Sequence, residues 1–129
     1  MSRSETKILL LENIHHVAKE MLSAEGYSVE LLPTALKEEE LAERLSGVSV
    51  LGIRSKTRVT PKVLSSAHTA SLLAVGCFCI GTNQVALVDA NKRGVPVFNA
   101  PFSNTRSVAE LMIAEIISLA RQLGEALFE

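Results

Sequence analysis

The chain has 129 residues, 47% of them hydrophobic, and a formal net charge of −1 at pH 7. This length suits one domain with a real hydrophobic core and is too short for a two-domain enzyme. The composition excludes a disordered chain, and the small charge argues against nucleic acid as a partner. The apolar run Ile8–Leu11 is too short for a signal peptide or a membrane span, so we expect a cytoplasmic protein with no membrane partner.

Cysteine and histidine spacing does not predict a metal or redox site. Cys77 and Cys79 are separated by one residue, unlike a C-x-x-C redox pair or the ligands of a structural zinc ion. We interpret them as small structural thiols. His15 and His16 would point about 100° apart on a helix, and His68 lies far away in the sequence, so we expect solvated or helix-capping roles for all three.

Short apolar runs alternate with segments of helical period, which is typical of a parallel sheet. The expected strands are Lys7–Leu11, Ser28–Leu32, Val48–Ile53, Leu72–Val75 and Val95–Phe98. The expected helices are His15–Glu25, Lys37–Leu45, a short one from Pro61, Val85–Arg93, and one that begins at a Ser107–Glu110 capping box and ends near Arg121. We therefore expect an α/β, flavodoxin-like open parallel five-stranded sheet of order 2-1-3-4-5, with helices on both faces.

Helical spacing also predicts which side chains pack inward. Val17, Met21 and Leu22 fall on one face of the first helix. Leu41 and Leu45 are expected to point toward the core from the second helix.

Polar residues follow four of the five expected strands. Glu12 and Asn13 follow the first strand, and Arg54–Thr57 follow the third. A glycine-bracketed turn, Gly76–Asn83, follows the fourth strand, and the loop Asn99–Arg106 follows the fifth. Because the carboxyl ends of parallel strands share one edge of the sheet, we expect a ligand there. Guanidinium, hydroxyl and backbone N–H groups at this edge favour an anion.

Each of these groups also has a purely structural interpretation. Arg54 is either a surface residue or an anion ligand, and its place directly after a buried run favours the ligand. Gly76 and Gly81 either shape a tight turn or expose backbone N–H groups to a ligand. Asn104 either begins a helix or contacts substrate. Three further cations, Lys56, Arg58 and Arg106, are interpreted as solvated charges that strengthen the local positive field.

Three segments, GIRSKTRVT, VGCFCIGTNQV and KRGVPVFNAPFSNTRSVAEL, resemble the substrate-binding domain of the D-2-hydroxyacid dehydrogenase family, in particular its members that oxidise 3-phosphoglycerate. The resemblance covers residues 5 to 122. It implies oxidation of 3-phosphoglycerate, a small anionic phosphorylated 2-hydroxy acid, to 3-phosphohydroxypyruvate with NAD, at the entry to serine biosynthesis.

The same resemblance implies roles for individual residues. Asn104 would face substrate and nicotinamide, and Val108 would lie near the nicotinamide ring as a cofactor contact. The implied substrate-binding set is Arg54, Ser55, Cys79, Ile80, Gly81 and Asn104.

The chain also departs from the family pattern. Ala86 and Val88 occupy a stretch where the family places an acid, and Asp89 follows it, so we expect an effect on stability. The chain has no G-x-G-x-x-G turn, and the family's catalytic arginine, acid and histidine lie in segments beyond it. We therefore expect a single domain over residues 1–129 without catalytic residues, inactive alone and belonging to a homo-oligomeric parent enzyme that binds NAD mainly elsewhere.

The alternative is a stand-alone binding or regulatory module on the same scaffold. A receiver domain would need acids clustered after the first strand and an aspartate ending the third, whereas Glu12 stands alone and Arg54 follows the third. A flavin carrier would need a Ser/Thr/Gly phosphate loop and aromatic walls, but the chain has no Trp and one Tyr.

Overall fold

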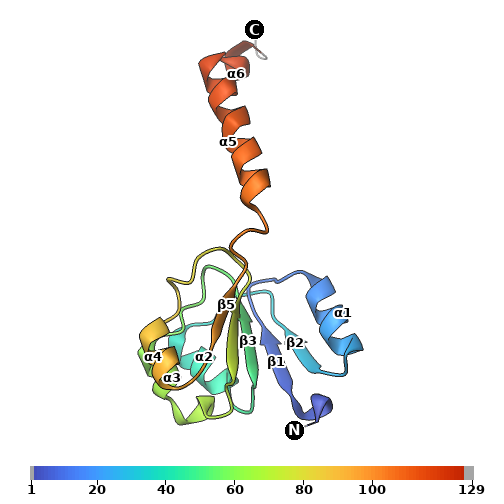
Figure 1. Ribbon diagram of the computed structural model, residues 1–129, viewed down its shortest axis with the longest axis vertical. Helices are drawn as coiled ribbons and strands as arrows, with labels where there is room; N and C mark the ends of the chain where they lie inside the picture. Colours follow the sequence, from blue (N-terminus) through green and yellow to red (C-terminus); the bar gives the residue numbers. More distant parts are fainter. Residues whose placement is uncertain (1, 127–129) are drawn as a thin grey trace.

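The computed structural model describes residues 2–126 and places five parallel strands in one sheet of order β2-β1-β3-β4-β5 (Figure 1). The strands are β1 (Lys7–Leu10), β2 (Ser28–Leu31), β3 (Val50–Ile53), β4 (Ala74–Cys77) and β5 (Val97–Asn99). The α-helices are α1 (His16–Ala24), α2 (Glu38–Arg44), α3 (Pro61–Ser65), α4 (Leu87–Lys92), α5 (Thr105–Ala120) and α6 (Leu123–Ala126), with 3-10 turns η1 (Arg3–Glu5) and η2 (Ala67–Thr69). The expected fold class and strand order are confirmed.

Two element boundaries differ from the sequence pattern because apolar residues next to the sheet serve other contacts. Leu72 is buried at the end of the η2 turn, where its N–H donates to Thr69, so β4 begins only at Ala74. Gly76 consequently lies inside β4. The expectation that it brackets the following turn is therefore wrong. Val85 pairs with Val59 in an isolated parallel bridge, so α4 begins at Leu87.

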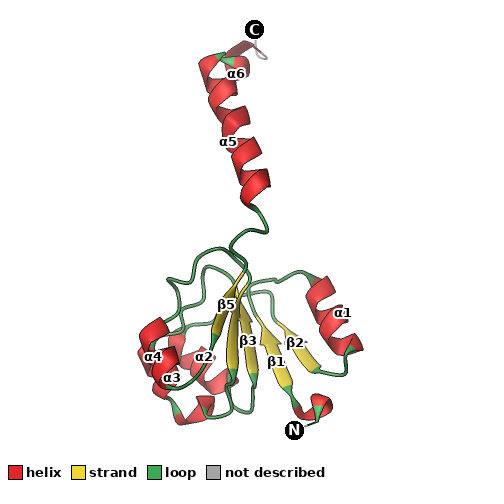
Figure 2. Ribbon diagram, in the orientation of Figure 1, coloured by secondary structure: helices red, strands yellow, loops and turns green. Residues whose placement is uncertain are grey.

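Most of the hydrophobic core lies on the face of the sheet that carries α2, α3 and α4 (Figure 2). Alternate strand residues point to this face because successive side chains in a strand alternate. Leu41 and Leu45, expected to point inward, are fully buried in it. The strand residues that belong to this core are Leu9, Leu51, Ile53, Val75 and Cys77.

The opposite face carries α1 and a smaller core built on Ile8, Leu10 and Ile14. Helix α1 packs against it through Ala18 and Leu22, whereas Met21 is 66% exposed. Of the three residues expected to point inward, Leu22 does so, but Val17 and Met21 are exposed, and the expectation is wrong for these two. The physical reason is that α1 covers the β1–β2 side of the sheet, and Val17 and Met21 line an open apolar pocket beside it.

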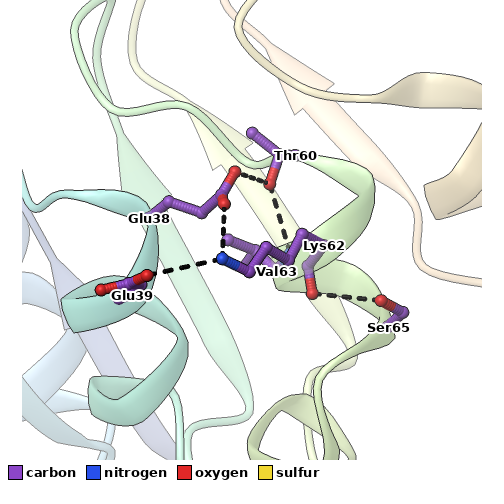
Figure 3. A network of polar contacts seen from close by, with 6 residues as sticks. All are labelled: Glu38, Glu39, Thr60, Lys62, Val63 and Ser65. Atoms are coloured by element: carbon purple, nitrogen blue, oxygen red, sulfur yellow. Dashed lines mark hydrogen bonds and ion pairs between the residues drawn. The ribbon is translucent and has the colours of Figure 1, made fainter.

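A polar network joins the start of α2 to the start of α3 (Figure 3). The Thr60 hydroxyl donates to Glu38 Oε2 over 2.6 Å and accepts from the Val63 N–H, so it caps α3 while holding α2. Lys62 Nζ lies 3.3 Å from Glu38 and 3.5 Å from Glu39. The hydrogen bond from Thr60 and the contact with Lys62 lower the pKa of Glu38.

Helix α5 extends away from the sheet and its layers (Figure 1). None of its residues is buried, and its exposed apolar side chains include Leu111, Ile113 and Ile116. The predicted capping box is wrong. Asn104 is the N-cap residue, Ser107 lies within the helix, and Glu110 instead forms a 2.7 Å ion pair with Arg106. The helix begins earlier because residues 105–107 contain no Gly or Pro that would interrupt it, although the Asn104 side chain makes no capping hydrogen bond.

Candidate functional site

The polar segment after β3 forms a pocket with the residues that follow β1 and β2. The segment Arg54–Thr57 is called the Arg54 segment below, and its first three residues line a cavity of about 440 Å³. Its side chains at Arg54, Ser55 and Lys56 are exposed, so a guanidinium, a hydroxyl and an ammonium group border it. The other lining residues are Glu12, Asn13, Pro33, Thr34 and Ala35. Two cations and a hydroxyl suit a small anion.

Glu12 is a buried carboxylate at the base of this pocket, only 7% exposed. Its oxygens accept the backbone N–H groups of Arg54 over 2.7 Å, Lys56 over 2.7 Å and Thr57 over 3.1 Å. Burial raises the pKa of Glu12, but these hydrogen bonds outweigh it and hold the pKa below its usual value. The Thr57 hydroxyl lies nearby and adds to the lowering, although it does not meet hydrogen-bond geometry.

The backbone at Glu12 is itself unusual. Glu12 and Asn13 have φ values of 61° and 55°, in the left-handed region that non-glycine residues seldom adopt. Their N–H groups donate to the Thr34 and Leu32 carbonyls, which hold the turn in place. Such strain persists only where surrounding contacts enforce it, and it is common at functional sites.

The turn after β4, residues Phe78–Asn83, is called the Cys79 loop below. It is attached to both neighbouring strands: the Phe78 N–H donates to the Ile53 carbonyl, and the Asn99 side-chain amide donates to the Ile80 carbonyl over 2.7 Å. The Cys79 carbonyl accepts from the Ala100 N–H. Three of the predicted site residues, Cys79, Ile80 and Gly81, therefore lie on a loop fixed next to the Arg54 segment.

The two thiols have different environments. Cys77 is buried in the core, and burial, with smaller effects from Cys79 and Glu12, raises its pKa to about 11. Cys79 is half-buried and donates to the Gly81 carbonyl at 3.2 Å. Both are free cysteines, and their interpretation as structural thiols stays a prediction.

Two paired glycines make room for Phe78 at the same edge. A Cβ at Gly52 would lie 3.1 Å from the Phe78 ring and 2.5 Å from Leu10, and one at Gly76 would lie 3.5 Å from the ring. Phe78 and Arg54 both line a second, mainly apolar pocket of about 690 Å³ beside α1. Arg54 thus stands between a polar pocket and an apolar one.

The remaining predicted residues lie farther along the chain. Asn104 is exposed, and its side chain makes no capping hydrogen bond to α5. Val108 is 45% exposed on the first turns of α5. The structure brings the Arg54 segment and the Cys79 loop together through the Gln84 amide. Helix α5, which carries Val108 and directly follows Asn104, instead extends away from the sheet (Figure 1).

The comparison with protein families supplies the decisive observation. The family model described as D-isomer specific 2-hydroxyacid dehydrogenase, catalytic domain, matches residues 8–123. The chain belongs to the D-2-hydroxyacid dehydrogenase family.

Relatives within the D-2-hydroxyacid dehydrogenase family cover nearly the whole chain. It is 56% identical over 95% of its length to D-3-phosphoglycerate dehydrogenase from Dictyostelium discoideum, and 56% identical over 99% to D-3-phosphoglycerate dehydrogenase 1 from Saccharomyces cerevisiae. The chain spans 30% and 27% of the length of these relatives.

A solved dehydrogenase shares the fold. NAD+-bound 3-phosphoglycerate dehydrogenase from Entamoeba histolytica superposes with a TM-score of 0.74 at 21% identity, over 88% of this chain and 38% of that one. A stand-alone receiver or flavin module is not favoured by these comparisons.

Two buried residues of this dehydrogenase-family site escaped the sequence reasoning. Glu12 was noted after the first strand only as an isolated acid, and Gln84, which follows the Gly76–Asn83 turn, was given no role. Both are at least nine-tenths buried and contact the Arg54 segment. An acid directly after the apolar run KILLL was the available signal for Glu12, because buried charges require hydrogen-bond partners.

Within residues 2–126, no helix is both long enough and apolar enough to cross a bilayer. The same residues contain no group of three or more His, Cys, Asp or Glu side chains placed to hold a metal ion. His15 accepts the Val17 N–H and so caps α1, as expected for a histidine in a capping role.

Proposed function

We propose that this chain is the substrate-binding part of an NAD-dependent D-3-phosphoglycerate dehydrogenase, which oxidises 3-phosphoglycerate to 3-phosphohydroxypyruvate at the entry to serine biosynthesis. The observation that carries the proposal is the 56% identity to two phosphoglycerate dehydrogenases over almost the entire chain. The cationic pocket at Arg54 supports it, because the substrate carries a phosphate and a carboxylate.

Arg54 is the proposed main anion ligand. Its guanidinium offers paired N–H donors that match a phosphate or carboxylate, and Ser55 adds a hydroxyl beside it. The Cys79 loop supplies backbone groups at Cys79, Ile80 and Gly81 on the neighbouring strand end. Lys56 borders the same pocket and adds positive charge.

The proposed reaction divides between this chain and other segments. The oxidation converts the C2 hydroxyl of the substrate to a carbonyl group: the hydroxyl proton leaves to a general base on other segments, and the C2 hydrogen leaves as hydride. NAD, when bound, supplies the hydride acceptor. The residues of this chain bind and orient the substrate anion, with Asn104 proposed to face the reacting carbon and Val108 the nicotinamide ring.

The chain is proposed to hold no catalytic acid, base or dinucleotide-binding turn, and residues 1–129 are proposed to form one domain. It has no G-x-G-x-x-G sequence, whose glycines let a backbone approach a pyrophosphate. By itself it should bind the substrate anion weakly and transfer no hydride. The parent enzyme is proposed to be cytoplasmic and homo-oligomeric, without nucleic-acid or membrane partners.

The test is an NMR titration of the ¹⁵N-labelled chain with 3-phosphoglycerate, with D-glycerate as the matched ligand that lacks the phosphate. We expect 3-phosphoglycerate to shift the amides of residues 54–56 and 79–81, and D-glycerate to shift them only at much higher concentration. Equal responses to both ligands, or shifts confined to other segments, would contradict the proposal.

A further inference from the structure

The main chain of Arg54 is held at both of its polar groups by buried side chains. The Arg54 N–H donates to Glu12 Oε2 over 2.7 Å, and the Arg54 carbonyl accepts from Gln84 Nε2 over 2.8 Å. Glu12 and Gln84 are 7% and 6% exposed, so neither contact is in competition with bulk water.

Glu12 binds the backbone of the Arg54 segment and does not neutralise the Arg54 guanidinium. All three hydrogen bonds recorded for its carboxylate come from N–H groups of the Arg54 segment, whereas the Arg54 guanidinium forms no ion pair among the described residues. A carboxylate next to an arginine usually pairs with it and cancels its charge. Here the Glu12 carboxylate accepts three backbone N–H groups instead, so the charge of the exposed Arg54 guanidinium stays available for a ligand.

Gln84 connects the two loops that we propose to hold the substrate. Its Nε2 group lies 3.3 Å from Cys79 Sγ as well as 2.8 Å from the Arg54 carbonyl. The side chain therefore spans from the Arg54 segment after β3 to the Cys79 loop after β4. A shift of either loop relative to the other must therefore move or break a contact of the Gln84 amide.

We propose that Glu12 and Gln84 are positioning residues for the anionic substrate, acting through the Arg54 backbone and not by contact with substrate. Glu12 fixes how far the Arg54 segment stands from the sheet edge, and Gln84 fixes its separation from the Cys79 loop. This inference rests on the proposed function, because it assumes that Arg54 binds the anion. An error of about 1 Å in the placement of a binding group is enough to weaken its interaction strongly.

The experiment is a double-mutant cycle in this chain, with the dissociation constant of 3-phosphoglycerate measured by NMR titration. The variants are Glu12→Gln, which keeps the size of the side chain, and Gln84→Met, which removes the donor. Each is made alone and combined with Arg54→Ala. We expect each single variant to raise the dissociation constant about fivefold, within the coupling range of residues that share a network, and to have no further effect once Arg54 is absent.

Arg93→Gln is the matched control for lost stability. Arg93, at the end of α4, donates to the Leu64 carbonyl of α3 and to Thr69 of η2 and does not line the Arg54 pocket, so its loss should lower the melting temperature without changing the dissociation constant. If Glu12→Gln fails to fold, Gln84→Met alone decides the question.

The outcomes separate the two proposals. A dissociation constant that is unchanged in Arg54→Ala removes the proposed anion ligand and with it the proposed function. The positioning role is overturned, while the proposed function stands, if Arg54→Ala weakens binding but Glu12→Gln and Gln84→Met do not. It is also overturned if Glu12→Gln and Gln84→Met weaken binding as much in the Arg54→Ala background as they do when Arg54 is present.

Discussion

Arg54 is the residue on which the proposed anion recognition depends most. Arg54→Ala should reduce the binding free energy of 3-phosphoglycerate by about 1.5 to 3 kcal/mol, the contribution typical of a hydrogen bond to a charged group. Its side chain is exposed, so the melting temperature should change little. Arg54→Lys should recover only part of the loss, because an ammonium group restores charge without the paired donors.

Calorimetric or NMR titration measures this effect, with Lys92→Ala, an exposed lysine on α4, as the control for a lost surface charge. Equal weakening in the Lys92 and Arg54 variants would mean that only net charge matters, and the specific role of Arg54 would then be wrong.

Glu12 should make the stability of the chain depend on pH in the acid range. Its pKa is lowered in the folded state, so its contribution is present above the ordinary carboxyl pKa of about 4.3 and is lost as pH falls through the lower folded value. In Glu12→Gln we expect the free energy of unfolding to fall by about 1 to 3 kcal/mol at neutral pH, because the carboxylate's buried donors lose a charged acceptor.

Urea unfolding of both proteins from pH 7 to pH 3 measures the difference. The difference in free energy of unfolding between the unmodified chain and Glu12→Gln should be constant down to about pH 5 and then become smaller. Glu5 and Glu38, whose pKa values are also lowered, titrate in both proteins and so cancel in the comparison. A gap that stays constant down to pH 3 would show that Glu12 does not titrate as described.

At the scale of elements, the start of α5 gives a direct test of the corrected helix boundary. Ser107 lies inside α5, is exposed and has no capping role. Ser107→Ala should therefore change the stability of α5 by less than about 0.5 kcal/mol or raise it slightly, since alanine is the better helix former. The capping box would instead predict a loss of about 0.5 to 2 kcal/mol.

Amide hydrogen exchange over residues 108–112 is the suitable measurement, because α5 stands clear of the sheet and can unfold locally. Asn104→Ala is the companion variant. Its side chain makes no capping hydrogen bond, so it should also leave exchange nearly unchanged, while substrate binding in an enzyme that carries the remaining segments should weaken.

Local patterns predicted the elements and their order because alternation and helical period act within a few residues. Lys7–Leu10 and Ser28–Leu31 follow their predicted ranges closely, and the handedness of βαβ units leaves few sheet orders to choose from. The boundaries failed where a tertiary contact competed with a local signal. Leu72 was expected in a strand and Val85 in a helix, but Leu72 completes the η2 turn and Val85 forms a bridge to Val59.

The candidate site was predictable only in part for the same reason. The place of Arg54 at the end of a buried strand follows from the topology of the sheet. That the Glu12 carboxylate meets backbone donors 42 to 45 residues away does not, because no local pattern specifies which N–H groups a buried acid will find.

At the scale of the whole molecule, we predict that this chain has no detectable dehydrogenase activity and no micromolar NAD site. Its only proposed cofactor contact is Val108, and it lacks the glycine-rich turn that binds a pyrophosphate. Calorimetry with NAD is the measurement, and the full-length Dictyostelium relative is the positive control. Stoichiometric binding at micromolar concentration would contradict the assignment of NAD binding to other segments.

The projection of α5 from the sheet has a mechanical consequence. The helix contains 16 residues, so it is about 24 Å long, and it joins the sheet through a short connection that follows Asn99. A rotation of about 10° in that connection would carry the far end of the helix through about 4 Å. The connection begins where the Ala100 N–H donates to the Cys79 carbonyl, so the pivot of such a rotation would lie directly beside the proposed substrate loop.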